Sequence, residues 1–245
     1  MSKNPLKLKI AYLYPDILQS FCDLANVQTF IQRAKLRNIE VNLQEISPND
    51  KIQATKYDFY YIGGSNLNMI DYALKFLLLN KEELKVASLC SVPILAVNMG
   101  YMLLCNSFQF NNRTKTLALG LLDVEAIEGK KFFSGNIYGT CEFLKNKTIA
   151  GYENHSMLSY LQKNVAPFIT LKKGFGNNNK DKTEGAIFNN TIGTYLTSSL
   201  LAQNPHLCDF LISTALRIKY KCRIPLTPLC DDIEYFSHNY IIETK

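Results

Sequence analysis

The hydrophobic residues of this chain follow the two periods that separate strands from helices. Ile39–Ile46 alternates apolar and polar side chains, as a strand with one solvated face does. Ile94–Val97 is a short continuous apolar run, typical of a parallel strand that is covered on both faces. Val27, Phe30 and Ala34 recur at helical spacing. Together these patterns predict strands at 9–14, 39–46, 57–62 and 94–97, and helices at about 17–37, 66–80, 81–90 and 205–218.

The second half of the chain is richer in Gly, Asn and short β-type runs. Such runs occur at 132–138, 148–152, 167–171, 185–188 and 192–196, and the stretch 107–117 is typical of a polar loop. We therefore predict an α/β protein with a mostly parallel twisted sheet, helices on both faces and extra short β elements in its second half. With no repeat and no linker, residues 1–245 are expected to form one domain, with a core at about 9–232 and a loose tail at 233–245.

Composition and charge narrow the classes of function. The chain has 27 Lys and Arg against 21 Asp and Glu, but its lysines are dispersed, which argues against nucleic-acid binding. No apolar run has the length of a membrane span, and the first residues do not have the pattern of a signal peptide. The seven cysteines form no CxxC pair and the three histidines lack ligand spacing, so we predict a cytoplasmic protein with reduced thiols and with no metal or cofactor.

The most informative stretch runs from Pro93 to Leu104. It predicts a buried strand, a sharp turn near Gly100 and then a helix, which is the layout of a nucleophile elbow. An enzyme of acyl transfer places Cys or Ser in that turn, whereas this chain has Asn98, and a carboxamide is not a usable nucleophile. Gly63 and Gly64 end another predicted strand. They indicate either a close backbone approach to a ligand or a plain strand-to-helix turn.

The order and spacing of nine stretches resemble class I glutamine amidotransferases of the cobyric acid synthase-like branch, and most closely the glutaminase subunits of lipid II isoglutaminyl synthase. The resemblance covers about 9–232. It is carried by 23–27, 32–39, 62–64, 93–104, 120–123, 151–155 (Gly-Tyr-Glu-Asn-His), 174–178 (Gly-Phe-Gly-Asn-Asn), 184–186 and 193–196 (Gly-Thr-Tyr-Leu).

The resemblance implies that an elbow Cys attacks the amide of glutamine with a His as base, and that ammonia passes to an ATP-dependent Mur-ligase-like partner subunit. This chain departs from the family pattern at the positions of the catalytic residues. Asn98 stands at the position of the Cys and Thr197 at that of the His. The substrate-binding Arg falls at Phe132, or at Lys131 with a shift of one residue, and the oxyanion loop reads Gly63-Gly64-Ser65. Glutamine binding is therefore in question, and Gly63, Gly64 and Lys131 are the predicted substrate-binding residues.

Cysteine and histidine residues elsewhere in the chain are candidate replacements for the missing groups. Cys90 precedes the elbow strand and Cys105 lies beyond it, and both are expected to be core thiols. His155 is expected to be a hydrogen-bonded structural residue, and His206 and His238 are expected at the surface.

Three hypotheses follow for the function. The first is a non-catalytic scaffold subunit that still binds a Mur-ligase-like partner. The second is an active glutaminase subunit with an unrecognised mechanism. The third is a sensor of a ligand or a protein that uses the empty pocket. The loss of nucleophile, base and Arg together favours the first.

Overall fold

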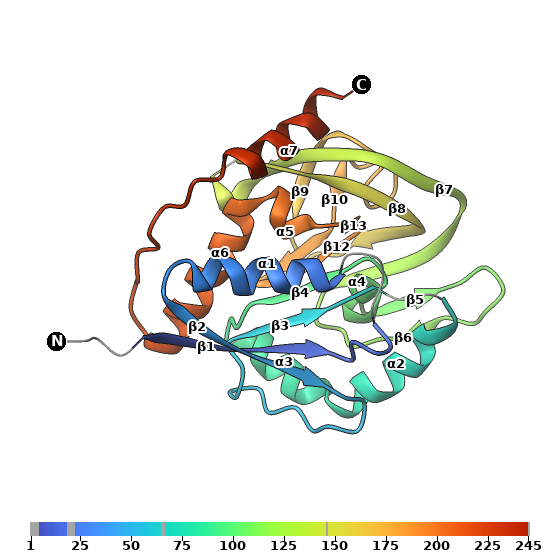
Figure 1. Cartoon of the computed structure of the whole chain (residues 1–245). Coiled ribbons are helices and arrows are strands. Elements are labelled where there is room, and N and C mark those ends of the chain that lie inside the picture. The colour runs from blue at the N-terminus through green and yellow to red at the C-terminus, as the bar shows by residue number, and fades with distance from the viewer. Residues whose placement is uncertain (1–4, 19–22, 65–66, 146, 245) are drawn as a thin grey trace.

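A mostly parallel six-stranded sheet forms the centre of the computed structural model, which describes residues 5–18, 23–64, 67–145 and 147–244 (Figure 1). Its strand order is β11-β12-β4-β3-β1-β2. The strands are β1 (Leu6–Leu13), β2 (Ile39–Ile46), β3 (Phe59–Ile62), β4 (Ile94–Val97), β11 (Ala186–Phe188) and β12 (Thr191–Thr194). Every pairing is parallel except that of β11 with β12. The predicted α/β class with a mostly parallel sheet is confirmed.

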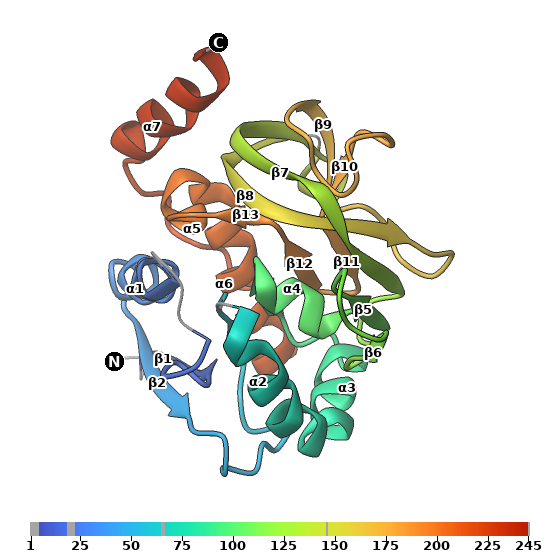
Figure 2. The same ribbon diagram turned by 90° about the vertical axis from the view of Figure 1, so that its right-hand side faces the viewer.

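Helices cover both faces of this sheet, as predicted (Figures 1 and 2). One face carries α1 (Asp23–Lys35), α5 (Leu200–Gln203) and α6 (Pro205–Tyr220), and the other carries α2 (Leu67–Leu79), α3 (Lys81–Leu89) and α4 (Met99–Leu104). Successive side chains of a strand point to opposite faces. Accordingly, Ile94 and Ala96 of β4 belong to the core under α2–α4, whereas Leu95 and Val97 belong to the core under α1 and α6.

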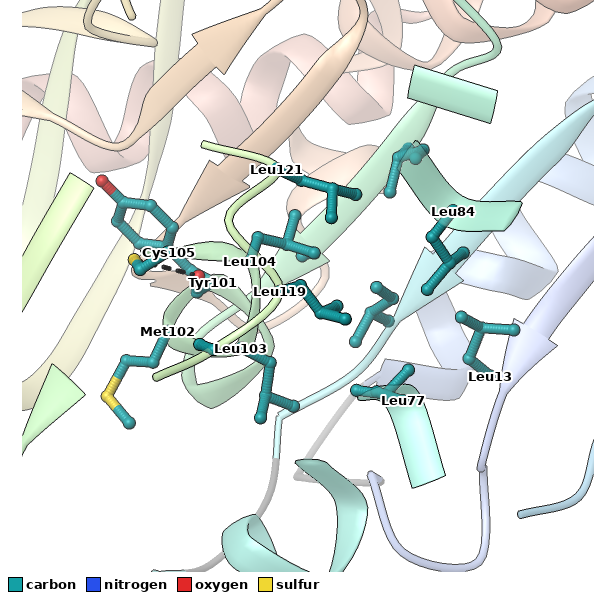
Figure 3. Close-up of a cluster of buried hydrophobic side chains, with 14 of the residues drawn as sticks. Leu13, Leu77, Leu84, Tyr101, Met102, Leu103, Leu104, Cys105, Leu119 and Leu121 are labelled. Atoms are coloured by element: carbon teal, nitrogen blue, oxygen red, sulfur yellow. Dashed lines mark hydrogen bonds between the residues drawn. The ribbon is translucent and has the colours of Figure 1, made fainter. Parts of the chain in front are cut away.

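The core around α4 contains a cluster of buried leucines. Figure 3 shows Leu103 and Leu104 of α4 among Leu77, Leu84 and Leu119. All five side chains are at most 1% exposed. Burial of a leucine side chain contributes about 1.5–3 kcal/mol, so this cluster fixes α4 against the sheet behind the elbow.

A second sheet is built mainly from two long antiparallel strands, β7 (Val124–Cys141) and β8 (Lys147–Leu161). The smaller members are β5 (Ser107–Gln109), β6 (Thr116–Leu117), β9 (Ile169–Lys173), β10 (Thr183–Glu184) and β13 (Leu196–Thr197), and a 3-10 turn, η1 (Glu142–Leu144), joins β7 to β8. The separate runs predicted at 132–138 and 148–152 are thus parts of longer strands, and the predicted loop at 107–117 contains β5 and β6. The polar segment at 128–133 interrupts the pairing of β7 with β8 by a register shift and does not end the strand.

The prediction of a loose tail at 233–245 was wrong, because residues 232–243 form the helix α7 (Asp232–Glu243). His238 and Ile241 of this helix are 2% and 7% exposed. The imidazole of His238 makes hydrogen bonds of 2.8 Å to Thr148 Oγ1 and 3.0 Å to the carbonyl of Gln203. The sequence signal was weak because the buried face of α7 includes a histidine and only a few aliphatic residues. In the part of the chain that the structure describes, no helix has the length and apolar content of a membrane span.

Candidate functional site at the elbow

Asn98 forms a sharp turn between β4 and α4 with φ 51° and ψ −119°. This conformation lies outside the regions that non-glycine residues ordinarily occupy, including the small left-handed region. The backbone N–H of Asn98 donates a 2.7 Å hydrogen bond to the carbonyl of Thr194, and its carbonyl accepts one of 3.0 Å from the Tyr101 N–H. The chain therefore retains the backbone of a nucleophile elbow although its side chain is a carboxamide.

The loop that contains Gly63 and Gly64 packs directly on the first turn of α4. A Cβ atom on Gly100 would lie 2.6 Å from the carbonyl oxygen of Gly63, and a Cβ on Gly63 would lie 2.1 Å from the carbonyl oxygen of Leu18. Only glycine fits at these two contacts. The N–H of Gly64 donates a 2.8 Å hydrogen bond to the carboxylate of Asp23. The Gly64 N–H is thus already bonded to a side chain of α1 and is not free to donate a hydrogen bond to an oxyanion. Ser65 lies outside the described residues.

Buried polar side chains connect this loop to the segment that follows β13. Tyr61 donates through its hydroxyl to Asp23 at 2.8 Å, and Asn26 donates to the Tyr61 hydroxyl at 3.1 Å. Asn26 also donates to the carbonyl of Ser198 at 3.1 Å and accepts from the Leu201 N–H at 2.9 Å. Since all of these bonds are buried or partly buried, they hold the glycine loop and the residues next to Thr197 at the same end of the central sheet.

Thr197 lies in β13, opposite Tyr152 of β8, and is half-buried. It lines a cavity of about 550 Å³ between the outer face of the second sheet and helices α5 and α7. Its hydroxyl cannot replace the imidazole of a general base, because an alcohol is neither basic nor acidic near neutral pH. The structure therefore brings Gly63 and Gly64 against the elbow that contains Asn98, and Asn26 links that loop to Ser198, next to Thr197; neither Asn98 nor Thr197 supplies the nucleophile or the base.

Lys131 is placed differently from the other predicted site residues. It lies in the interrupted stretch of β7 between Glu128 and Phe133, and its side chain is exposed. Within the described residues no ion pair or hydrogen bond to Lys131 is found, and the neighbouring Phe132 is 64% exposed. A role for Lys131 in substrate binding remains a prediction.

The described cysteines do not supply a replacement nucleophile at the elbow. Cys105 is fully buried beside Tyr101, and burial raises the pKa of its thiol, which disfavours the reactive thiolate. Cys90 precedes β4, at the end of the strand opposite to Asn98, and it is exposed, so its prediction as a core thiol was wrong. Cys22 lies outside the described residues.

The histidines do not supply a base at the elbow either. His155 is 4% exposed, makes a 2.9 Å hydrogen bond through Nδ1 to the carbonyl of Met157 and stacks on Tyr195 with 4.0 Å between ring centroids. Its Nε2 lies 3.5 Å from the Glu153 carboxylate and has no hydrogen-bond partner among the described residues. His238 is buried on the inner face of α7, so its predicted surface position was wrong. The described residues contain no group of three potential ligands that could hold a metal ion.

Glu184 is a buried acidic residue that sequence reasoning did not single out. Its carboxylate accepts hydrogen bonds from the Tyr195 N–H at 2.6 Å and from the Thr194 hydroxyl at 2.9 and 3.0 Å. Burial raises the pKa of Glu184 to about 8, and these donors oppose that rise. The available signal was that Glu184 and Thr194 both belong to stretches that carry the family resemblance. Glu184 fixes the backbone that leads from β12 to Thr197.

Comparison with known proteins agrees with this geometry. The family model described as the CobB/CobQ-like glutamine amidotransferase domain matches residues 9–205. The GatD subunit of lipid II isoglutaminyl synthase (glutamine-hydrolyzing) from Staphylococcus aureus is 32% identical over 222 residues, which cover 91% of this chain and 88% of that relative. The subunit of the same name from Streptococcus pneumoniae is 26% identical over 230 residues, covering 94% of this chain and 88% of the relative.

Solved structures show the same fold at low sequence identity. A glutamine amidotransferase structure superposes with a TM-score of 0.56 at 13% identity, covering 84% of this chain and 98% of the other. A glutamine amidotransferase from Thermotoga maritima has a TM-score of 0.54 at 12% identity, with coverage of 99% and 100%. Since the family model spans most of the chain and the elbow backbone lies within it, this protein belongs to the CobB/CobQ-like glutamine amidotransferase family.

Proposed function

We propose that this protein is a non-catalytic glutamine amidotransferase-like subunit that acts as a scaffold for an ATP-dependent Mur-ligase-like partner in the amidation of a peptidoglycan precursor. The observation that carries the proposal is Asn98, which occupies a preserved elbow backbone without a nucleophilic atom. Amide hydrolysis by this family's chemistry needs a thiolate beside an imidazole. The carboxamide of Asn98 and the hydroxyl of Thr197 supply neither.

The partner and the pathway are inferred from the relatives. Two of them are named as subunits of lipid II isoglutaminyl synthase, and the aligned region covers 88% of each. A chain that keeps the fold over this length while lacking the chemical groups is consistent with a retained binding role. We place the complex in the cytoplasm, where the partner's ATP is available.

The first test is the release of ammonia from glutamine by the purified protein, alone and with its co-expressed partner. Removing a nucleophile from such a site lowers the rate by many orders of magnitude, so we expect no turnover above the background of the Asn98→Ala variant. Turnover by the wild type that Asn98→Ala abolishes would contradict the proposal. It would support the second candidate, an active glutaminase subunit, which the words "glutamine-hydrolyzing" in the relatives' names favour.

The second test addresses the scaffold role directly. The protein and a Mur-ligase-like subunit from the same genome are co-expressed and analysed by size-exclusion chromatography at micromolar concentration. We expect a complex that amidates its acceptor with ammonium but not with glutamine as the nitrogen source. Two separate monomers, together with partner activity that does not change on adding this protein, would exclude the scaffold role.

A further inference from the structure

The cavity beside Thr197 has a floor made by three neighbouring strands. Asn136 of β7, Tyr152 of β8 and Thr197 of β13 are consecutive cross-strand partners. Alternation along β8 turns Tyr152 and Asn154 to this outer face and buries Glu153 and His155 on the other. Helices α5 and α7 form the walls through Gln203 and Tyr240. With about 550 Å³, the cavity has the size of ordinary small-molecule sites.

Most of the polar side chains that line this cavity lack partners within the described part of the protein, whereas the Tyr152 hydroxyl shares a 2.9 Å hydrogen bond with Ser134 Oγ. Among the described residues no hydrogen bond is found for the side chains of Asn136, Asn154, Thr197 or Gln203. The Oε1 atom of Gln203 is buried and unpaired. A buried acceptor without a partner costs about 1–3 kcal/mol unless a ligand or water pairs with it. The carboxamides of Asn136 and Asn154 and the hydroxyl of Thr197 line one cavity and are partly or fully exposed, so they are available to hydrogen-bond a ligand.

The lining is also free of charge. Among the described residues that line the cavity, none is Lys, Arg, His, Asp or Glu. An amino acid such as glutamine would bring an ammonium and a carboxylate into it without an opposite charge, which is unfavourable. Carboxamides donate and accept at once, and Tyr152 and Tyr240, 40% and 62% exposed, offer aromatic surface at the same site.

We propose that this cavity binds a neutral, hydroxyl-rich ligand of the monosaccharide class. Sugar hydroxyls are both donors and acceptors and so match the unpaired carboxamides, while the C–H face of a pyranose ring packs on a tyrosine ring. The cavity includes Thr197, which stands at the position of the family's base, but sugar binding there needs neither a nucleophile nor a base and does not depend on the scaffold role.

The test is saturation-transfer NMR on the full chain with D-glucose, N-acetyl-D-glucosamine, D-glucuronate and L-glutamine, each at about 10 mM, a concentration suited to millimolar affinities. We expect transfer to at least one of the two neutral sugars, with an affinity roughly tenfold or more above that for glucuronate and glutamine, because the charged probes lack a counter-charge. The variants Asn154→Ala and Tyr240→Ala should each lower the affinity about fivefold or more, which corresponds to the loss of one such contact.

Asn239→Ala is the matched control, because Asn239 is exposed on α7, next to Tyr240, but does not line the cavity. It should bind like the wild type. Asn154 and Tyr240 are exposed, so their variants should fold, and equal melting temperatures will show that they do. Absence of transfer to both neutral sugars overturns the proposal and leaves a water-filled cavity. Saturation transfer to a sugar that is unchanged in both variants would mean that the sugar binds elsewhere on the protein. Preferential binding of glutamine would mean that the cavity binds an amino acid. Either result also overturns the proposal.

Discussion

Asn98 has the backbone conformation of a nucleophile elbow, but its own side chain cannot act as a nucleophile. A strained residue of this kind lowers the stability of the folded protein by about 1–3 kcal/mol, and it persists because the surrounding structure holds its backbone in place. Here the surroundings are the hydrogen bond to Thr194, the apolar packing of α4 and the contact between Gly100 and Gly63. The side chain of Asn98 makes no capping hydrogen bond. The turn is therefore imposed by its neighbours.

This strain predicts that Asn98→Gly stabilises the protein. Glycine adopts positive φ without a steric penalty, and we expect a gain of about 1 kcal/mol after the greater entropy of the unfolded chain is subtracted. Chemical denaturation measures the change. The matched control is Asn42→Gly on the exposed side of β2, which should destabilise the protein by about 0.5–1 kcal/mol. A loss of stability in Asn98→Gly would show that the amide has a structural role.

The raised pKa of Glu184 predicts a dependence of stability on pH. Its folded-state pKa of about 8 lies above the ordinary value of 4.5, so the folded protein holds the proton more tightly. This contribution is fully present below pH 4.5 and is lost as the pH rises through 8. Glu184→Gln removes the titration but keeps an acceptor for the Tyr195 N–H.

The melting temperature of Glu184→Gln, taken relative to that of the wild type, should therefore increase steadily between pH 5 and pH 8, because only the wild type ionises. Glu40→Gln, at an exposed ion pair on β2, should show no such trend. Parallel curves for Glu184→Gln and the wild type would mean that Glu184 is ionised throughout the range.

At the scale of elements, the helices and strands with a strong hydrophobic pattern were predicted correctly from the sequence. The buried run of β4, the turn near Asn98 and the helical spacing of α1 are each visible in a few consecutive residues, although distant partners hold β4 and the turn in place. The length of β7 was missed because its polar segment near Lys131 faces solvent. His155 is a buried, hydrogen-bonded structural residue, as expected, but the burial of Glu153 and Glu184 was missed because burial of polar groups depends on partners far along the chain.

Helix α7 should loosen when the solution becomes acidic. Burial lowers the pKa of His206 to about 4 and also lowers that of His238, and these two rings lie against each other and against Tyr235. Stability from these neutral rings is fully present above about pH 6.5 and is lost as the pH falls toward 4.

We expect limited proteolysis to release the segment that contains α7 faster at pH 5 than at pH 7, with a protease whose own rate has been calibrated at both values. His206→Gln should reduce the difference, because one of the two titrating rings is gone. Equal protection of α7 at both pH values in the wild type would contradict this account.

At the scale of the whole molecule, one arginine connects distant parts of the chain. Arg33 of α1 is 4% exposed and binds Asp209 of α6 at 2.9 Å and Asp231, just before α7, at 2.6 and 3.1 Å. Arg37 adds a 2.7 Å contact to the same Asp209. The Arg33 side chain therefore joins α1 to residues that lie 176 and 198 positions further along the chain.

Arg33→Ala should destabilise the protein by about 3 kcal/mol, because Asp231 would lose its arginine partner and Asp209 would keep only Arg37. The control is Arg113→Ala, whose ion pair with Asp71 is about half exposed and should contribute about 0–1 kcal/mol. Urea unfolding of both variants gives the comparison. Equal and small losses would show that solvent screens the Arg33 cluster as well.

The alternation of β4 between two cores has a consequence for how the molecule melts. Ile94 and Ala96 belong to one core, and Leu95 and Val97 to the other, so the same four-residue strand is indispensable to both. Neither layer can disorder while its neighbour persists intact. We expect a single calorimetric transition in which the van't Hoff and calorimetric enthalpies agree. Leu95→Ala, at a fully buried position, should shift that one peak to lower temperature without splitting it, so a shoulder in the thermogram would show that the two layers melt separately.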